Sequence, residues 1–234
     1  MLSGFSRRRF LSVTAACAVL TGLSGCAQLD ESPVLKAEHL VDASVATVER
    51  FQTLEGLQNF SKYLPDSVAI AIFPSVIKAG FFIGGEAGNG LMMVRTGPGR
   101  WSAPAFYTLG AGSFGIQIGA QDTEIILVIR NQGALDAVLK DQAKIGADAG
   151  VTAGIYGVGA EASTTTNLGA DVLAFANAKV GGYVGASVEG AVIARRQDIN
   201  EAVYGTGKTP RDIVTNPANR MARADRLAAV LSKY

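Results

Sequence analysis

The side chains that most often perform catalysis or hold metals are scarce in this sequence. His39 is the only histidine, and it falls on the face of a predicted helix opposite the apolar residues, where we expect it to be solvated. The two cysteines are Cys17 and Cys26. Zinc sites and Cys–His or Ser–His catalytic groups need several such residues together. We therefore expect no enzyme, no metal and no other cofactor.

Carboxylates are the remaining acid or base candidates, and five of them stand out: Glu86, Asp122, Glu124, Glu161 and Glu189. Only Asp122 and Glu124 are spaced as a pair, because residues two apart in a strand share one face. A carboxylate pair at a strand end beside a glycine-rich turn is more often solvated than part of a calcium or catalytic site. We assign none of the five to a site.

Cys26 has the clearest predicted chemistry. The arginines 7–9 precede an apolar run from Leu11 to Leu23, which ends in the tetrapeptide Leu23-Ser24-Gly25-Cys26. A basic segment, a short apolar run and small residues are typical of an export signal peptide. The run is shorter than the roughly 20 residues that span a bilayer as a helix. The tetrapeptide resembles the bacterial lipobox, and this resemblance predicts cleavage before Cys26 and a covalent diacylglyceryl anchor on its thiol.

The export route has two interpretations. Ser6-Arg7-Arg8-Arg9-Phe10-Leu11 resembles the twin-arginine motif, which exports a folded domain, but basic residues also begin signals of the general secretion route. An ordinary secretory signal with a chance cysteine is the alternative to lipidation. The residue after Cys26 is Ala27 and not an aspartate. By resemblance to enterobacterial lipoprotein sorting, an aspartate at this position would favour retention in the inner membrane. We therefore expect an outer-membrane anchor with the domain facing the periplasm.

Four regions are expected along the chain: a signal peptide at 1–25, a lipidated tether at 26–32, a helical region at 33–64 and one domain at 65–234. Ser32 and Pro33 are a typical helix start. The helix that follows should bury one apolar stripe: Val34, Ala37, Val41, Val45, Val48 and Phe51. A second short helix should reach Tyr63.

Short apolar and β-branched runs separated by glycines begin near residue 67 and are typical of strands and turns. Strands are expected at 68–73, 79–84, 90–95, 101–109, 113–119 and 123–129, with hairpin turns at 84–90 and 97–99. A helix is expected at 131–144, then strands within 151–162, 172–178 and 182–194, then a helix capped by Asn216 and Pro217. The predicted class is α+β, with an N-terminal helical segment, an antiparallel glycine-rich sheet or partly closed barrel, and a C-terminal helix.

Two groups of residues are candidates for contact with phospholipid. Trp101 beside Arg100 suits a membrane interface, although the indole ring could instead cover the open end of the core. Arg220 and Arg223 flank the apolar stripe of the terminal helix and could reach lipid headgroups, although this helix could also simply pack on the sheet. Three further cations are candidates, Lys78, Arg95 and Lys144, and an exposed apolar groove rimmed by any of them or by Arg100 would favour lipid binding.

Four blocks of the sequence resemble a known family: AIAIFPSVIKAGFFIGGEAGNGLMMVR, RWSAPAFYTLGAGSFGIQIGAQDTEIILVI, KIGADAGVTAG and KVGGYVGASVEGAVI. Over about residues 67–205 they resemble a SYLF domain. The resemblance implies an α+β domain that binds phospholipids, phosphoinositides in eukaryotic members, with some members also binding actin. It also implies that bacterial members are commonly envelope lipoproteins, and it supplies no catalytic motif.

These features predict a lipid-anchored envelope protein whose domain binds membrane phospholipids without catalysing a reaction. The alternative is a structural or interaction protein that binds an envelope protein or a second copy of itself. Without the three arginines of the expected signal peptide, 18 basic residues remain against 20 acidic ones, and this net charge near −2 disfavours nucleic acid as a partner. An apolar groove rimmed by cations would favour the first function, and a flat polar or self-complementary apolar patch the second.

Overall fold

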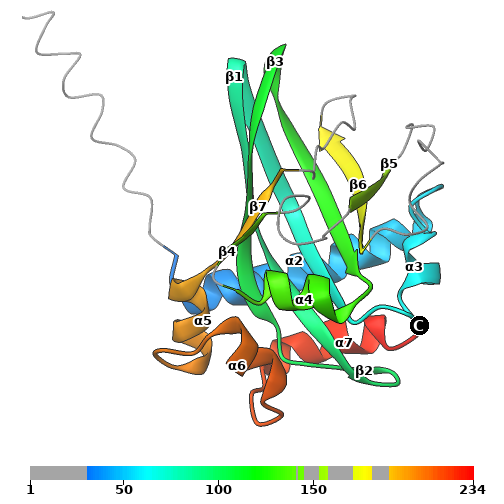
Figure 1. Cartoon of the computed structure of the whole chain (residues 1–234), viewed down its shortest axis with the longest axis vertical. Helices are drawn as coiled ribbons and strands as arrows, with labels where there is room; N and C mark the ends of the chain where they lie inside the picture. The colour runs from blue at the N-terminus through cyan, green and yellow to red at the C-terminus, as the bar shows by residue number, and fades with distance from the viewer. Residues whose placement is uncertain (1–30, 141, 145–152, 158–170, 181–189) are drawn as a thin grey trace, which may run out of the picture. The chain divides into compact units, whose positions relative to one another are not determined.

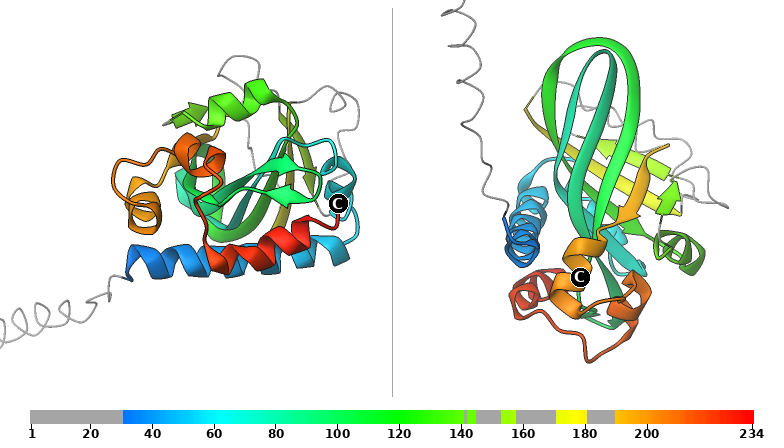
Figure 2. Two further views of the ribbon diagram at one scale, coloured as in Figure 1. Left: turned by 90° about the horizontal axis from the view of Figure 1, so that it is seen from below. Right: turned by 90° about the vertical axis from the view of Figure 1, so that its left-hand side faces the viewer.

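A curved sheet with helices on both faces forms the body of the protein (Figure 1; Figure 2, left). The computed structural model describes residues 31–140, 142–144, 153–157, 171–180 and 190–234. Residues from Pro33 to Tyr234 make one compact unit. Helices α2 and α7 lie side by side on one face of the sheet, and α4 lies on the other.

The N-terminal helix α2, Pro33–Thr53, begins at the predicted proline. Its predicted stripe is buried from Ala37 to Phe51, against the face of the sheet that also carries Ile70 and Ile72. Val34 is 42% exposed, so the stripe begins one turn later than expected. The short helix α3, Phe60–Tyr63, ends at the predicted residue and buries Phe60 in the same core.

Two long strands make the centre of the sheet. β1, Ala69–Gly97, and β3, Ala105–Ile129, pair antiparallel from Ala69 with Ile129 to Met92 with Ala105. The predicted turn at 97–99 is confirmed, and it leads into the short strand β2, Arg100–Trp101. Gly99 has a φ of 62°, a conformation that glycine adopts without steric cost.

The hairpin turn predicted at 84–90 is wrong, because β1 continues through this stretch as a strand. β1 and β3 instead bend over together and return as a folded two-stranded ribbon (Figure 2, right). At two positions inside the bend there is no room for a side chain: a Cβ on Gly88 would lie 2.2 Å from the carbonyl oxygen of Ser75, and one on Gly90 would lie 2.3 Å from that of Ile72. These glycines permit close backbone approach.

Four shorter strands complete a seven-stranded sheet among the described residues: β4 (Gln142–Lys144), β5 (Ala153–Gly157), β6 (Val172–Val180) and β7 (Val192–Arg195). β6 pairs with the second half of β3, and β7 pairs with its first half. β4 adds to β7, and β5 runs parallel to β6. The described sheet is mostly antiparallel and not closed into a barrel, so the predicted α+β class is confirmed.

The remaining helices differ from the prediction in three places. α4, Gln132–Val138, ends early because Gln142–Lys144 pairs with β7 instead of continuing the helix. α5, Gln197–Tyr204, was not expected. The predicted Asn216–Pro217 cap is wrong, because the terminal helical segment begins only after Met221. Thr209 and Asp212 instead form a capping box that starts an unexpected helix, α6 at Pro210–Thr215, and Asn216 follows its last turn.

The chain ends in a 3₁₀ turn, η2 at Ala222–Ala224, and the helix α7 at Asp225–Leu231. Alternate strand residues divide the apolar side chains between two cores. One core lies under α4 and α6, and the other under α2, α3, α5 and α7. Within the part of the chain that the structure describes, every helix is too short or too polar to cross a membrane.

Candidate functional site

A cleft of about 470 Å³ opens between the end of the β1–β2 turn and the segment that leads into α7. Arg100 and Trp101 lie on the strand side, and Arg220, Met221 and Asp225 lie on the opposite side. The apolar lining includes Met93, Val214, Ala224 and Ala228. The volume falls within the range of small-molecule sites, and the lining mixes cations, an aromatic ring and apolar side chains.

Trp101 is held in place from behind the cleft. The guanidinium of Arg95 lies over its ring, 4.4 Å from the ring centroid, and the ring packs against the core below α7. Arg95 donates hydrogen bonds to the carbonyl oxygens of Ser67, at 3.1 Å, and Leu64, at 2.5 Å. Burial lowers the pKa of Arg95. Trp101 therefore both covers the end of the core and lines the cleft, so its two sequence interpretations are compatible.

The two cleft arginines are more open to solvent. Arg100 is exposed on β2, and its guanidinium lies so close to Gly97 that a Cβ there would be 2.8 Å from Nη2. The side chain of Arg220 is 79% exposed, and its Nη2 lies 4.0 Å from Oδ1 of Asp225. Both guanidiniums are therefore accessible to an anionic group that enters the cleft.

Arg223, by contrast, connects η2 to α2 through hydrogen bonds. It donates two hydrogen bonds to the carboxylate of Asp42 on α2, one of them 2.8 Å long from Nε to Oδ1. These bonds lower the pKa of the Asp42 carboxyl. Arg226 makes a similar 3.1 Å contact with Glu49. Arg223 therefore contributes to a contact between η2 and α2 that lies outside the cleft.

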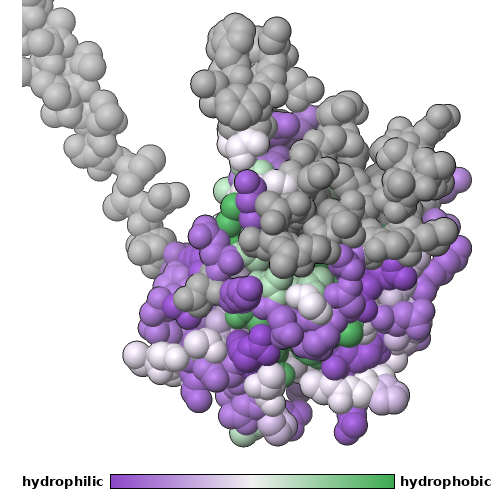
Figure 3. Space-filling model, in the orientation of Figure 1, coloured by the Kyte–Doolittle hydropathy of each residue, from purple (hydrophilic) through white to green (hydrophobic). Residues whose placement is uncertain are grey.

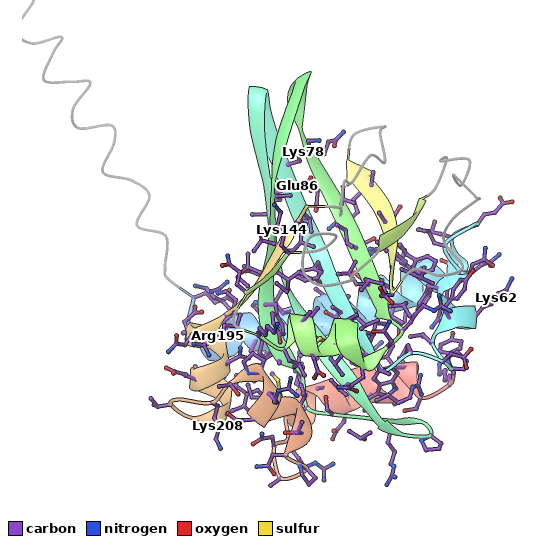
Figure 4. The ribbon with its side chains drawn as sticks, viewed as in Figure 1. Lys62, Lys78, Glu86, Lys144, Arg195 and Lys208 are labelled. Carbon is purple, nitrogen blue, oxygen red and sulfur yellow. The ribbon has the colours of Figure 1, made fainter. Side chains whose placement is uncertain are left out.

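Lys78 and Lys144 lie elsewhere, on the bent ribbon and on β4 (Figure 4). Lys78 lies near Glu86, and its charge partly offsets the rise that burial causes in the pKa of the Glu86 carboxyl. Of the four cations considered as the rim of a groove, only Arg100 lines this cleft. The structure instead brings together Arg100, Trp101 and Arg220, with Arg95 behind the indole ring.

Asp122 and Glu124 do not form a carboxylate pair. Glu124 is 1% exposed and accepts hydrogen bonds from Thr47, Arg50 and Asn177, which join α2, β3 and β6. Asp122 accepts a 2.7 Å bond from Ser75 and lies 2.8 Å from the Nζ of Lys179. Each carboxylate is thus bound by its own set of side chains, through hydrogen bonds or an ion pair that connect elements of the fold.

The other chemical candidates that the structure describes add no second site. Glu161 and Glu189 lie outside the described residues. His39 is exposed, as expected from its position on the helix. In the described ranges no three His, Cys, Asp or Glu side chains are grouped so that they could hold a metal. On the face that Figure 3 shows, hydrophilic residues cover most of the helical half and hydrophobic residues surface only in small areas.

Sequence reasoning missed the acidic member of the cleft. Asp225 begins α7, and nothing in its local sequence distinguishes it from other exposed acids. Asn216 and Asn219 were also not expected in the lining, since Asn216 was predicted to cap the terminal helix and Asn219 had no predicted role. These residues reach the cleft only because the segment after α6 folds back towards β2.

Comparison with known proteins places this fold in a family. A family model described as a Las17-binding protein actin regulator, Ysc84, matches residues 110–234, which include one whole side of the cleft. The chain belongs to the Ysc84, or SYLF, family. The predicted SYLF resemblance is thereby confirmed.

Similar SYLF proteins are known in fungi and animals. An SH3 domain-containing protein of Schizosaccharomyces pombe is 30% identical over 69% of this chain and 38% of its own length. The LAS seventeen-binding protein 3 of Saccharomyces cerevisiae is 30% identical over 67% of this chain and 35% of its own. The human SH3 domain-containing YSC84-like protein 1 is 27% identical over 68% of this chain and 47% of its own length. The chain thus spans less than half the length of these relatives.

Proposed function

We propose that this protein is a lipid-anchored protein of the cell envelope whose SYLF domain binds membrane phospholipid, without catalysis, through the cleft between β2 and α7. The observation that carries the proposal is the meeting of Arg100, Trp101 and Arg220 around one cleft. A guanidinium binds phosphate through two parallel hydrogen bonds, and an indole ring suits the boundary between headgroups and acyl chains. The methionines in the lining can adapt to an irregular apolar group.

The proposed anchor would place the cleft close to its ligand. If Cys26 is acylated, seven peptide units separate it from Pro33, and a chain of this length reaches at most about 25 Å when fully extended. The domain would then stay at the surface of one membrane, which we expect to be the periplasmic face of the outer membrane. Tethering raises the effective concentration of lipid, so a weak headgroup site is sufficient.

Co-sedimentation of the soluble domain from Ala27 onward with liposomes tests this function. We expect binding to vesicles that contain phosphatidylglycerol, weakened by added salt because the arginine contacts are screened. Arg100→Glu combined with Arg220→Glu should lower the partition coefficient about tenfold or more, equivalent to roughly 1.4 kcal/mol. Lys62→Glu is the matched control, since Lys62 is exposed on α3, outside the cleft lining.

Two results would contradict the proposal. One is that the domain sediments with no vesicle, and the other is that Lys62→Glu lowers the partition coefficient as much as the double arginine variant does. Either result would favour the second candidate, a structural or interaction protein of the envelope. The observation in its favour is that the yeast LAS seventeen-binding protein 3 is named for a protein partner.

A further inference from the structure

We infer that the cleft recognises a headgroup that carries both a phosphate and a primary ammonium, as phosphoethanolamine does, in preference to a purely anionic headgroup. This inference rests on the proposed function and names its ligand class. It comes from the charge arrangement of the cleft: Oδ1 of Asp225 lies 4.0 Å from Nη2 of Arg220, and Arg100 lines the same cleft.

The ion pair between Arg220 and Asp225 is open. Its closest atoms are 4.0 Å apart, which is too long for a hydrogen bond, and the side chain of Asp225 is 68% exposed. Other arginines of this chain form direct hydrogen bonds with their carboxylate partners: Arg196 donates to Asp198 at 2.7 and 2.9 Å, and Arg211 donates to Asp136 at 2.8 Å. The Asp225 oxygens therefore remain available to a donor that enters the cleft.

A phosphate held by the two guanidiniums would lie beside this carboxylate. With a purely anionic headgroup the two negative charges repel each other, and the repulsion offsets part of the attraction to the arginines. A primary ammonium removes the conflict, because it is a cation with three N–H donors and Asp225 is an acceptor.

The same reasoning separates two zwitterionic lipids. A choline headgroup has the same net charge as an ethanolamine headgroup, but its quaternary nitrogen has no N–H group to donate to Asp225. The cleft should therefore rank phosphatidylethanolamine above both phosphatidylcholine and phosphatidylglycerol at physiological salt. General attraction of cations to a negative surface would produce a different order, with phosphatidylglycerol first.

The test compares Asp225→Asn with the unchanged domain on three vesicle types: phosphatidylcholine alone, and the same lipid mixed with equal fractions of phosphatidylethanolamine or phosphatidylglycerol. We expect Asp225→Asn to lose five- to tenfold in binding to the ethanolamine vesicles and to keep or gain binding to the glycerol vesicles. Asp225→Glu should retain the preference. Glu55→Gln, which changes an exposed acid outside the cleft, is the matched control.

A soluble probe separates headgroup recognition from effects of ethanolamine lipids on bilayer packing. Glycerophosphoethanolamine should displace the domain from vesicles at lower concentration than glycerophosphoglycerol, and Asp225→Asn should abolish this difference. Preference for the glycerol lipid, or equal effects of Asp225→Asn on both lipids, would overturn the inference while the proposed function stands. Absence of binding to all vesicles would overturn both.

Discussion

The arginines of this chain show that the neighbours of a cation decide its role. Arg95 and Arg223 donate to backbone carbonyls or to a carboxylate, so their hydrogen bonds hold segments together. Arg100 and Arg220 lie in the cleft with exposed side chains. All four are equivalent in the sequence, where each is an arginine close to apolar residues. Of these four arginines, only the second pair lines the cleft that we propose as the lipid site.

At the same scale, Glu86 makes stability depend on pH. It is 9% exposed on β1, and burial raises the pKa of its carboxyl from its ordinary value of 4.5, while Lys78 opposes the rise. A raised pKa means that the folded chain holds this proton more tightly than the unfolded chain does. The contribution of the protonated Glu86 carboxyl to the stability of the fold is therefore complete below pH 4.5, and it is lost as the pH rises through the raised pKa.

Glu86→Gln should remove this dependence. Because the amide carries no charge to bury, we expect the variant to unfold at a higher urea concentration than the unchanged protein at about pH 7, and at a similar concentration near pH 4. Urea unfolding at the two pH values measures the effect, with the exposed Glu55→Gln as control. A lower urea midpoint at neutral pH would show that attraction between Lys78 and Glu86 outweighs the cost of burial.

At the scale of elements, the bent ribbon of β1 and β3 organises the fold. Its two halves carry different neighbours, β6 on one and β7 on the other, and each face contributes to one of the two cores. The bend is tight where Gly88 and Gly90 pass the backbone of residues 72–76. Glycine at these positions is a packing requirement of the bend.

Gly90→Ala should therefore be strongly destabilising. The added Cβ would lie 2.3 Å from the carbonyl oxygen of Ile72 and 2.5 Å from a ring carbon of Phe73, so the backbone must move. We expect a loss of roughly 2–4 kcal/mol in the free energy of unfolding, measured by chemical denaturation. Gly112→Ala on β3 is the matched control, because no atom of the described residues would lie within 4 Å of the methyl group that it adds. Equal effects of the two substitutions would contradict the packing argument.

At the scale of the whole molecule, the proposed anchor and the proposed cleft make separable contributions to membrane binding. Cys26→Ser in the full chain should abolish incorporation of labelled palmitate and move the protein from the membrane fraction to the soluble fraction. Cys17→Ser should leave both properties unchanged, since Cys17 lies in the expected signal peptide. Labelling of the Cys26→Ser variant at the unchanged level would contradict acylation at this residue.

Local signals in the sequence were sufficient for some elements. Pro33 marks the start of α2 and the 97–99 turn joins β1 to β2, because both depend on residues adjacent in the chain. The glycine-rich sequence at the bend of β1 resembles that of a hairpin turn. The bend itself depends on contacts with backbone that is distant in the sequence. α5 was missed because it is short and polar: its Asn200 is buried and exchanges two hydrogen bonds with the backbone of Phe106 in β3.

Three members of the cleft were predictable one by one, but their meeting was not. Arg100, Trp101 and Arg220 were candidates from the sequence, since cations beside aromatic or apolar residues are typical of lipid-facing surfaces. Their assembly depends on the packing of α7 beside β2, far along the chain. Asp225 has no distinguishing local pattern, so only the folded arrangement shows its proximity to Arg220.

The long ribbon also implies an order of folding. Met92 and Ala105 pair close to the 97–99 turn, whereas Ala69 must find Ile129 at the far end of both strands. Closing a short loop costs less entropy than closing a long one, so pairing should spread outward from the turn. The stretch of β1 that carries Ile70 and Ile72, which is part of the surface against which α2 packs, would therefore form last. Although α2 is synthesised before the sheet, its apolar stripe would be among the last surfaces to be covered, and the newly made chain would expose it longest to chaperones.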